Sequence, residues 1–250
     1  MTITVTNVND EVPRWNHALH LEVSVQEESP LGTEIVTVSA TDDDEGLAGI
    51  PRYYLAGITP AATAPSIDLD GLSGQVTLQS RLNREDVAAF TVTIGVTDLG
   101  TPQLVGPQIT VTVVAADINE FPPVFSQALY AFEALERNQP SVTSIGQLVV
   151  TDLDVDENAA VSFEIVGQST ADTGLQVFAI NTTGHVLVVD VLDRENRDQY
   201  EFEVIATNTA PPYFSANTTV VVSVLDINDS PPDFEQAQFT LRVSEDAALG

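Results

Sequence analysis

The chain has 250 residues, of which 43% are hydrophobic and 18% charged, so it can bury a core and does not have the composition of a disordered protein. Eight arginines and no lysine face 37 acidic residues, and the net charge of −29 argues against binding to nucleic acid or to an anionic membrane surface. The absence of cysteine excludes disulfides, zinc–thiolate sites and cysteine nucleophiles. This balance points instead to metal cations, basic partners or a salt-adapted surface.

The first residues lack the basic segment and apolar stretch of a signal peptide, so we expect the sequence to begin inside a longer protein. A motif that starts at Asn9 recurs at Asn119 and Asn228, which are 110 and 109 residues apart. Because a unit of this length can bury its own core, the spacing predicts an array of domains. The predicted segments are the last strand of a preceding repeat (1–8), two complete repeats (9–118 and 119–227) and the start of a following one (228–250).

Alternating apolar and polar residues predict the strands of each repeat. In the first repeat the alternation covers 19–25, 35–40, 90–96 and 109–113, and in the second the run 220–224 corresponds to the last of these. Such runs, rich in β-branched residues, are typical of half-buried strands. With about seven short strands and no convincing helix per repeat, the pattern favours an all-β fold of tandem Greek-key, Ig-like β-sandwiches stacked end to end.

Acidic residues gather at three kinds of place in each repeat: after the first strand, in the turn after the second strand, and at the joint between repeats. In chain order of repeats these are Glu27, Glu136 and Glu245; the turns 42–45 and 152–157; and the joints 117–120 and 226–229. Further carboxylates precede a later strand, at 84–85 and 193–195. Neighbouring carboxylates cannot all ionise without a counter-charge.

A hard divalent cation would supply that charge. Calcium takes 6–8 oxygen ligands from carboxylates, amides and backbone carbonyls, whereas magnesium demands near-octahedral geometry and retains water. The dispersed oxygen donors of this chain therefore favour calcium. A solvated acidic surface would explain any one cluster, but the same three clusters recur at one spacing.

In these motifs the chain resembles the extracellular repeats of cadherins, over nearly its whole length, and specifically those of long non-classical cadherins or protocadherins. The matching segments are Glu27 with 30–33, the A-x-D-x-D-x-G loop at 40–46, the D-R-E-like motifs at 83–85 and 193–195, the D-x-G-x-P-like motif at 97–102, and the D-x-N-D-N-x-P-like joints.

The resemblance implies calcium sites at each joint, normally three ions. At the central joint the implied ligands are Glu27, Asn83, Glu85, Asp117, Ile118 (carbonyl), Asn119, Glu120, Phe121 (carbonyl), Asp152, Asp154, Asn158 (carbonyl) and Asn208. At the first joint they are Asn7, Asn9, Asp10, Glu11 (carbonyl), Asp42, Asp44, Ala48 (carbonyl) and Asp98, and at the third Glu136, Asp193, Glu195, Asp226, Ile227 (carbonyl), Asn228 and Asp229.

The central joint departs from the family pattern. Asn83 and Asn208 stand where the family has Asp, Glu120 also replaces Asp, and Phe121 replaces Asn. Phe121 matters least, because a carbonyl is the expected donor there. Loss of formal charge lowers calcium affinity. Our hypothesis is that the central joint binds fewer or weaker ions than the family norm.

The resemblance implies a calcium-dependent cell–cell adhesion protein, of which this chain is an internal ectodomain fragment stiffened by calcium. We expect an extracellular, cell-surface location, a membrane-anchored parent, other cadherin-type ectodomains as homophilic or heterophilic partners, and glycosylation at the sequons that begin at Asn181 and Asn217. Alternatives are a protein-binding module that presents the segment 57–65, or a flexible elbow with reduced calcium binding. We expect no enzyme: paired carboxylates can hydrolyse glycosides, but these lie at recurring joints rather than in a cleft.

Overall fold

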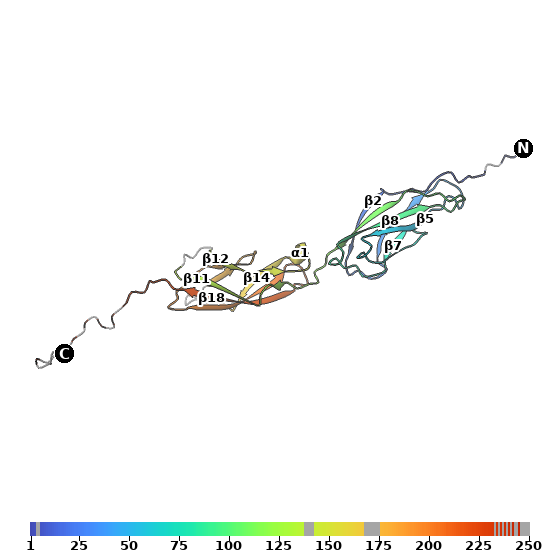
Figure 1. Ribbon diagram of the computed structural model, residues 1–250. Helices are drawn as coiled ribbons and strands as arrows, with labels where there is room; N and C mark the ends of the chain where they lie inside the picture. Colours follow the sequence, from blue (N-terminus) through green and yellow to red (C-terminus); the bar gives the residue numbers. More distant parts are fainter. Residues whose placement is uncertain are drawn as a thin grey trace. The chain divides into compact units, whose positions relative to one another are not determined.

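The computed structural model describes residues 1–3, 6–137, 143–167, 176–232, 234, 236, 238, 240, 242 and 245. The chain forms two compact units (Figure 1). Unit 1 comprises Met1–Val124, Thr151–Val161 and Thr207–Ser215, and unit 2 comprises Phe125–Val150, Ser162–Ala206 and Ala216–Gly250. No helix in the described ranges is both long and apolar enough to cross a membrane.

The first repeat forms a β-sandwich of two sheets with a short strand pair at its edge. One sheet has the strand order β2 (His20–Gln26), β9 (Ile109–Ala116), β8 (Ala89–Thr97) and β5 (Arg52–Thr59). The other has the order β3 (Glu34–Thr37), β7 (Gln75–Leu78) and β6 (Ile67–Leu69), and β1 (Arg14–Trp15) pairs with β4 (Ala40–Thr41). Strands β2 and β9 run parallel, in register from the pair His20–Thr110 to the pair Gln26–Ala116.

Alternation of buried and partly exposed residues places the core of this sandwich. In β8 and β9 every second side chain is buried, and Phe90, Ile94 and Ile109 are at most 2% exposed. Trp15 stacks on Tyr53, with the ring centroids 5.7 Å apart, and packs against the same core. Trp15 therefore has a packing role.

The second repeat forms an equivalent sandwich. One sheet has the strand order β11 (Leu129–Leu135), β18 (Ser215–Leu225), β17 (Gln199–Asn208) and β14 (Val161–Val166). The other has the order β12 (Thr143–Gln147), β16 (His185–Val188) and β15 (Phe178–Ile180). In addition, β10 (Val124–Phe125) pairs with β13 (Val150–Thr151). Phe178 is fully buried between the rings of Tyr200 and Phe202, at centroid distances of 5.3 and 5.1 Å. The predicted all-β sandwich fold is confirmed.

Two local predictions were wrong. The run 35–40 is not one strand: β3 pairs with β7 whereas β4 pairs with β1, and the buried Val38 between them donates its N–H to the carbonyl of Gly74 (3.0 Å). The turn after β13 contains a single helical turn, α1 (Asp156–Ala159), although no helix was expected. This turn buries no side chain, so it leaves no apolar periodicity in the sequence.

Candidate metal centres in the acidic clusters

Glu27 is a buried carboxylate that ties two distant loops to the end of β2. It is 1% exposed, and its two oxygens accept the backbone N–H groups of Arg84 (2.7 Å) and Ile118 (3.0 Å). The recurrent Glu therefore organises the backbone of both loops.

Glu136 repeats this arrangement in the second repeat. Also 1% exposed, it accepts the N–H groups of Ile227 (2.6 Å) and Arg194 (2.9 Å). These backbone hydrogen bonds, that from Ile227 first, lower the pKa of the Glu136 carboxyl below its ordinary value. The carboxylate is thus held in its charged form, which is the form that binds cations.

Five carboxylates form what we call the central cluster: Glu27, Glu85, Asp117, Glu120 and Asp154. All five belong to unit 1, because that unit includes the loop Thr151–Val161. Oxygens of Glu27, Glu85 and Glu120 lie within 4.8 Å of one another, and so do oxygens of Glu85, Asp117 and Asp154. Burial, reinforced by the neighbouring carboxylates, raises the pKa of Glu85, Glu120 and Asp154. A cation bound here would remove that repulsion.

Three carboxylates of the central cluster, Asp117, Asp154 and Glu120, each have one buried oxygen that accepts no hydrogen bond from the described residues. Asp117 Oδ2 accepts the N–H of Val155 (3.1 Å) and the side-chain amide of Asn158 (2.9 Å), and Asp154 Oδ2 accepts the N–H of Phe121 (3.1 Å). The buried oxygens without a hydrogen bond are Oδ1 of Asp117, which has only a longer ion pair with Arg84, Oδ1 of Asp154 and Oε1 of Glu120. A buried carboxylate oxygen without a donor is costly, so this donor set fits an oxygen-binding cation such as calcium.

The sequence reasoning missed two arginines beside the central cluster. Arg84 Nη1 lies 3.6 Å from Asp117 Oδ1, and Arg81 lies 4.0 Å from the Glu120 carboxylate and also pairs with Glu28. They offset part of the negative charge. Arg84 is the arginine of the D-R-E-like motif at 83–85, so that motif could have indicated a positive charge beside the carboxylates.

The side-chain oxygen of Asn83 is occupied by hydrogen bonds within its own turn and is therefore not available as a cation ligand. Its Oδ1 accepts the N–H groups of Glu85 (2.7 Å) and Asp86 (3.2 Å). The other side-chain atom of an asparagine amide is a donor, which cannot ligate a cation. Asn83 thus adds no second oxygen to the central cluster.

The corresponding residue in the second repeat, Asp193, can serve both purposes. Asp193 Oδ1 accepts the N–H of Asn196 (3.1 Å), and an oxygen of Asp193 lies within 4.8 Å of oxygens of Glu136 and Glu195. Of the other residues predicted at the third joint, Asp229 forms an ion pair with Arg137. The remaining three are exposed: Asp226, Ile227 and Asn228.

We call Asp152, Asn158 and Asn208, which the second repeat contributes to the predicted ligands of the central joint, the lower end of that joint, and amide hydrogen bonds join them. Asn208, which is 1% exposed, donates through Nδ2 to Asp152 Oδ2 and to the carbonyl of Asn158, both at 2.9 Å. Asn119 donates to the carbonyl of Ala210 (2.7 Å), and its buried Oδ1 accepts no hydrogen bond in the described ranges. These residues also belong to unit 1.

Much of the ligand set predicted for the first joint also comes together. Asn9 Nδ2 donates to Asp98 Oδ2 (3.0 Å), and Asp44 accepts the N–H of Glu11 (3.1 Å) and donates its own N–H to Asp42 (3.0 Å). The Oδ1 of Asn9 and the Oδ2 of Asp42 are buried without a donor among the described residues.

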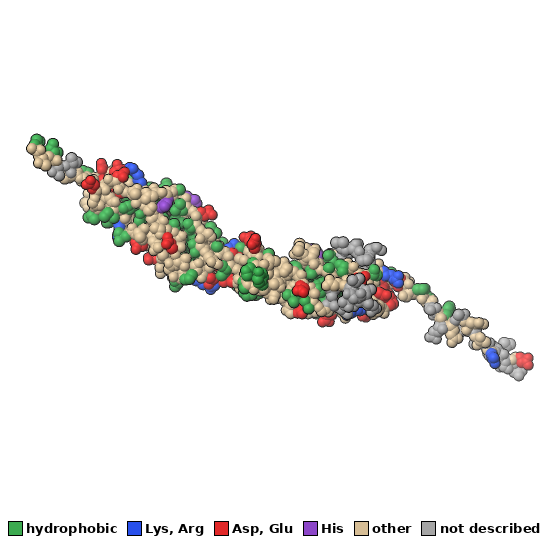
Figure 2. Space-filling model, turned by 180° about the vertical axis from the view of Figure 1, so that it is seen from behind, with side chains coloured by type: hydrophobic (Ala, Val, Ile, Leu, Met, Phe, Trp, Pro, Cys, Tyr) green, Lys and Arg blue, Asp and Glu red, His purple; other side chains and the backbone are tan. Residues whose placement is uncertain are grey.

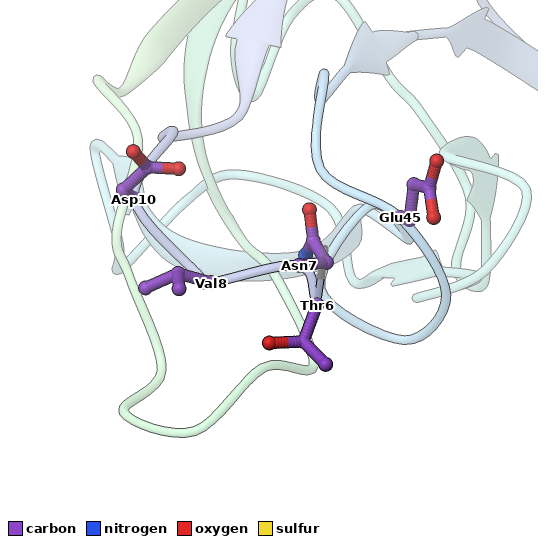
Figure 3. A pocket seen from close by; sticks show the side chains of 5 residues that line it. All are labelled: Thr6, Asn7, Val8, Asp10 and Glu45. Atoms are coloured by element: carbon purple, nitrogen blue, oxygen red, sulfur yellow. The ribbon is translucent and has the colours of Figure 1, made fainter. Parts of the chain in front are cut away.

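The remaining residues of that set lie apart from these contacts. Asn7 and Asp10 line a surface hollow with Glu45, and Figure 3 shows Asp10 and Glu45 on opposite sides of it. Ala48, which follows the acidic turn 42–45, is buried. On the face shown in Figure 2, acidic side chains form separate groups, and basic side chains lie beside several of them.

Both predicted glycosylation asparagines are exposed, and their modification stays a prediction. Asn181 Oδ1 accepts the N–H groups of Thr183 (3.0 Å) and His185 (2.9 Å), while Asn217 donates to Glu203. The segment 57–65, considered as a binding loop, begins in β5 and continues as a turn.

Comparison with known proteins places the chain in a family. The model of the cadherin domain matches residues 21–114 and 131–225. The chain is 31% identical over 250 residues to protocadherin Fat 4 of Mus musculus, 30% over 259 to protein dachsous of Drosophila melanogaster, and 32% over 250 to cadherin EGF LAG seven-pass G-type receptor 2 of Homo sapiens. Each match covers 100% of this chain but only 5%, 7% and 8% of the respective relative.

Solved structures agree. The EC22-24 fragment of mouse cadherin-23 is 29% identical with a TM-score of 0.69, covering 92% of this chain and 72% of that one. The extracellular domain of protocadherin GammaB4 is 23% identical with a TM-score of 0.73, covering 88% and 35%, and supports the fold alone. The family is one of cadherin domains and not of enzymes, in line with the expectation from the sequence. With two cadherin domains that together span more than half of its length, the chain belongs to the cadherin family.

Proposed function

We propose that this chain is an internal, calcium-stiffened part of the extracellular region of a cell–cell adhesion protein. The proposal places the chain outside the cell, in a membrane-anchored parent whose repeats correspond here to 9–118 and 119–227. Family membership supports the adhesion class. The observation that carries the role of calcium is the central cluster, in which buried oxygens of Asp117, Asp154 and Glu120 accept no hydrogen bond from the described residues.

The chain's own residues explain why an ion would change its mechanics. Glu27 fixes the positions of the loops at Arg84 and Ile118 through backbone hydrogen bonds, with or without a cation. Asp117 and Asp154 add hydrogen bonds between the segments 117–121 and 154–158, but they also bring negative charges together. Bound calcium would supply the missing positive charge and additional oxygen coordination. Ligands that bind only the ordered arrangement also stabilise it by mass action.

Calcium titration of the purified chain tests this proposal. We expect heat of binding in calorimetry, and a scattering profile whose maximum dimension and stiffness rise with calcium and saturate. Extracellular modules of this class bind at roughly 10⁻⁴–10⁻³ M. Asp154→Asn should weaken binding, whereas Glu22→Gln, on an exposed position of β2, should leave it unchanged. A wild-type chain that neither binds calcium nor changes its scattering would refute the proposal.

Partner recognition needs a separate assay. We propose that the partners are other cadherin-type ectodomains, either identical or different. Beads coated with the chain should aggregate in calcium and disperse in chelator if the fragment itself makes a homophilic contact. Beads that stay dispersed in both conditions, while calcium binding is intact, would assign the fragment a spacer role.

A further inference from the structure

A single asparagine changes the lower end of the central joint. Asn208 ends β17, and its amide nitrogen bridges Asp152 Oδ2 and the carbonyl of Asn158, at 2.9 Å from each. These two oxygens belong to the set implied as calcium ligands by the family resemblance. The neutral amide donor thus makes contacts with both oxygens that a cation would otherwise make.

The first repeat provides the matched comparison. Asp98, which lies 110 residues before Asn208, is fully buried and has only acceptor atoms. It accepts the N–H groups of Gly100 (2.9 Å) and Leu104 (3.1 Å) and the side-chain amide of Asn9 (3.0 Å). Its ionised side chain has no donor to offer to its neighbours.

Asp152, which Asn208 contacts, differs accordingly from Asp42, its counterpart 110 residues earlier. Asp42 Oδ1 and Asp152 Oδ1 each accept the N–H two residues on, at 3.0 and 3.1 Å. The second oxygen of Asp42 is buried without a donor among the described residues, whereas that of Asp152 accepts the Asn208 amide. Asparagine at position 208, where the first repeat has Asp98, therefore gives Asp152 Oδ2 a hydrogen-bond donor. The corresponding oxygen in the first repeat, Asp42 Oδ2, has no donor among the described residues.

The Asn208 amide has two possible orientations, which exchange its nitrogen and its oxygen. In the observed one, nitrogen faces the two acceptors, and Oδ1 is buried without a donor in the described ranges. The opposite orientation would set oxygen against Asp152 and the Asn158 carbonyl, an arrangement that only a cation makes favourable. An ion at this position would have to break two hydrogen bonds and would gain a neutral oxygen in place of a carboxylate.

We infer that the Asn208 amide replaces one calcium ion at the lower end of the central joint, so that this end is closed by hydrogen bonds in the presence and in the absence of calcium. The inference rests on the proposed function, because it assumes that the rest of the joint binds calcium. It specifies which position of the joint is lost and which group occupies it.

Two variants of the full chain test the inference. Asn208→Asp removes the donor and restores a carboxylate, so we expect about one further calcium ion per chain in calorimetry. In chelator the same variant should melt at a lower temperature than wild type, because the introduced carboxylate would then face Asp152 without an ion. Asn208→Ala should also melt lower in chelator, because the bridge is lost, but should gain no ion.

The outcomes separate this inference from the proposed function. Calcium binding by wild type with no added ion in Asn208→Asp would overturn the inference alone. So would unchanged melting of both variants in chelator. Absence of calcium binding in wild type and Asn208→Asp alike would overturn the proposed function and the inference together.

Discussion

Glu27 and Glu136 each accept two backbone N–H groups from residues 57 or 58 and 91 positions away in the chain. Such carboxylates serve as structural acceptors before any ion arrives. Asn83 and Asn208 illustrate the converse, since one amide is committed to a turn and the other to a bridge. At this scale, the atoms left without a partner decide which residues are available to a cation.

Replacing Glu27 by alanine should destabilise the first repeat even in chelator. The substitution leaves the N–H groups of Arg84 and Ile118 without their acceptor, at a cost of roughly 1–3 kcal/mol for each. Denaturant unfolding followed by the fluorescence of Trp15, the single tryptophan, measures this in the first repeat. Glu22→Ala, on the exposed face of β2, serves as the control. Equal stability of the two variants would contradict the structural role.

Asn83→Asp should strengthen calcium binding at the central cluster. One carboxylate oxygen can keep the turn, as Asp193 does, while the second becomes available as a ligand. We expect roughly tenfold tighter binding, or about 1.4 kcal/mol. Calorimetry measures it, and Asp193→Asn provides the reverse substitution. A calcium affinity that is the same with Asn or Asp at position 83 would show that the turn, and not the charge, sets this position.

Asp70 should make the stability of the first repeat sensitive to acid. The N–H groups of Ser73 and Leu72 donate to its carboxylate, both at 2.8 Å, and lower its pKa. A lowered pKa in the folded state adds stability above the unfolded value of about 3.9. That contribution is lost as the pH falls through the folded pKa.

Comparison with Asp70→Asn isolates this effect, because asparagine keeps an acceptor but does not titrate. The advantage of wild type over the variant, followed by Trp15 fluorescence in denaturant, should shrink as the pH is lowered from about 5 to about 2. A constant difference over this range would rule out a titrating contribution from Asp70.

At the scale of elements, tight turns hold the sheets in register. Gly74, between β6 and β7, has a φ of +75°, and a Cβ atom there would lie 2.1 Å from the carbonyl oxygen of Val38. Gly184 repeats both features, with a φ of +79° and 2.5 Å to the Leu148 carbonyl oxygen. The backbone comes too close at these turns for any other residue.

Gly74→Ala should therefore destabilise the first repeat more than Gly32→Ala. Both glycines have positive φ, so both variants carry strain of roughly 1–2 kcal/mol. Only Gly74 adds a clash with backbone, because a Cβ atom at Gly32 would have nothing within 4 Å. Denaturant midpoints from Trp15 fluorescence measure the difference. Similar midpoints would show that the Val38 strand end moves aside at little cost.

The strands could be predicted because alternation in β8 and β9 directly reports which face is buried. The break between β3 and β4 could not, because it depends on which distant strands they pair with, β7 for β3 and β1 for β4. The acidic clusters were predictable from their repeated spacing. The unpartnered oxygens and the position of Arg81 were not, because they follow from side-chain contacts between distant loops.

At the scale of the whole molecule, 37 acidic residues and eight arginines imply strong self-repulsion, which favours looser states unless cations offset it. We expect calcium to raise the melting temperature more than sodium chloride at equal ionic strength, because screening acts on all charges whereas ligation acts at the clusters. Magnesium should have an intermediate effect. Differential scanning calorimetry measures this, and equal shifts with all three salts would indicate screening alone.

The parallel pairing of β2 with β9, and of β11 with β18, has a mechanical consequence. Because paired strands point the same way, the chain enters each sandwich at one end and leaves it at the other. A pull on the two ends of a repeat would therefore load all seven register pairs of β2 and β9 at once, in shear, instead of peeling them apart one by one. Each repeat is connected in the way that suits a tether under tension.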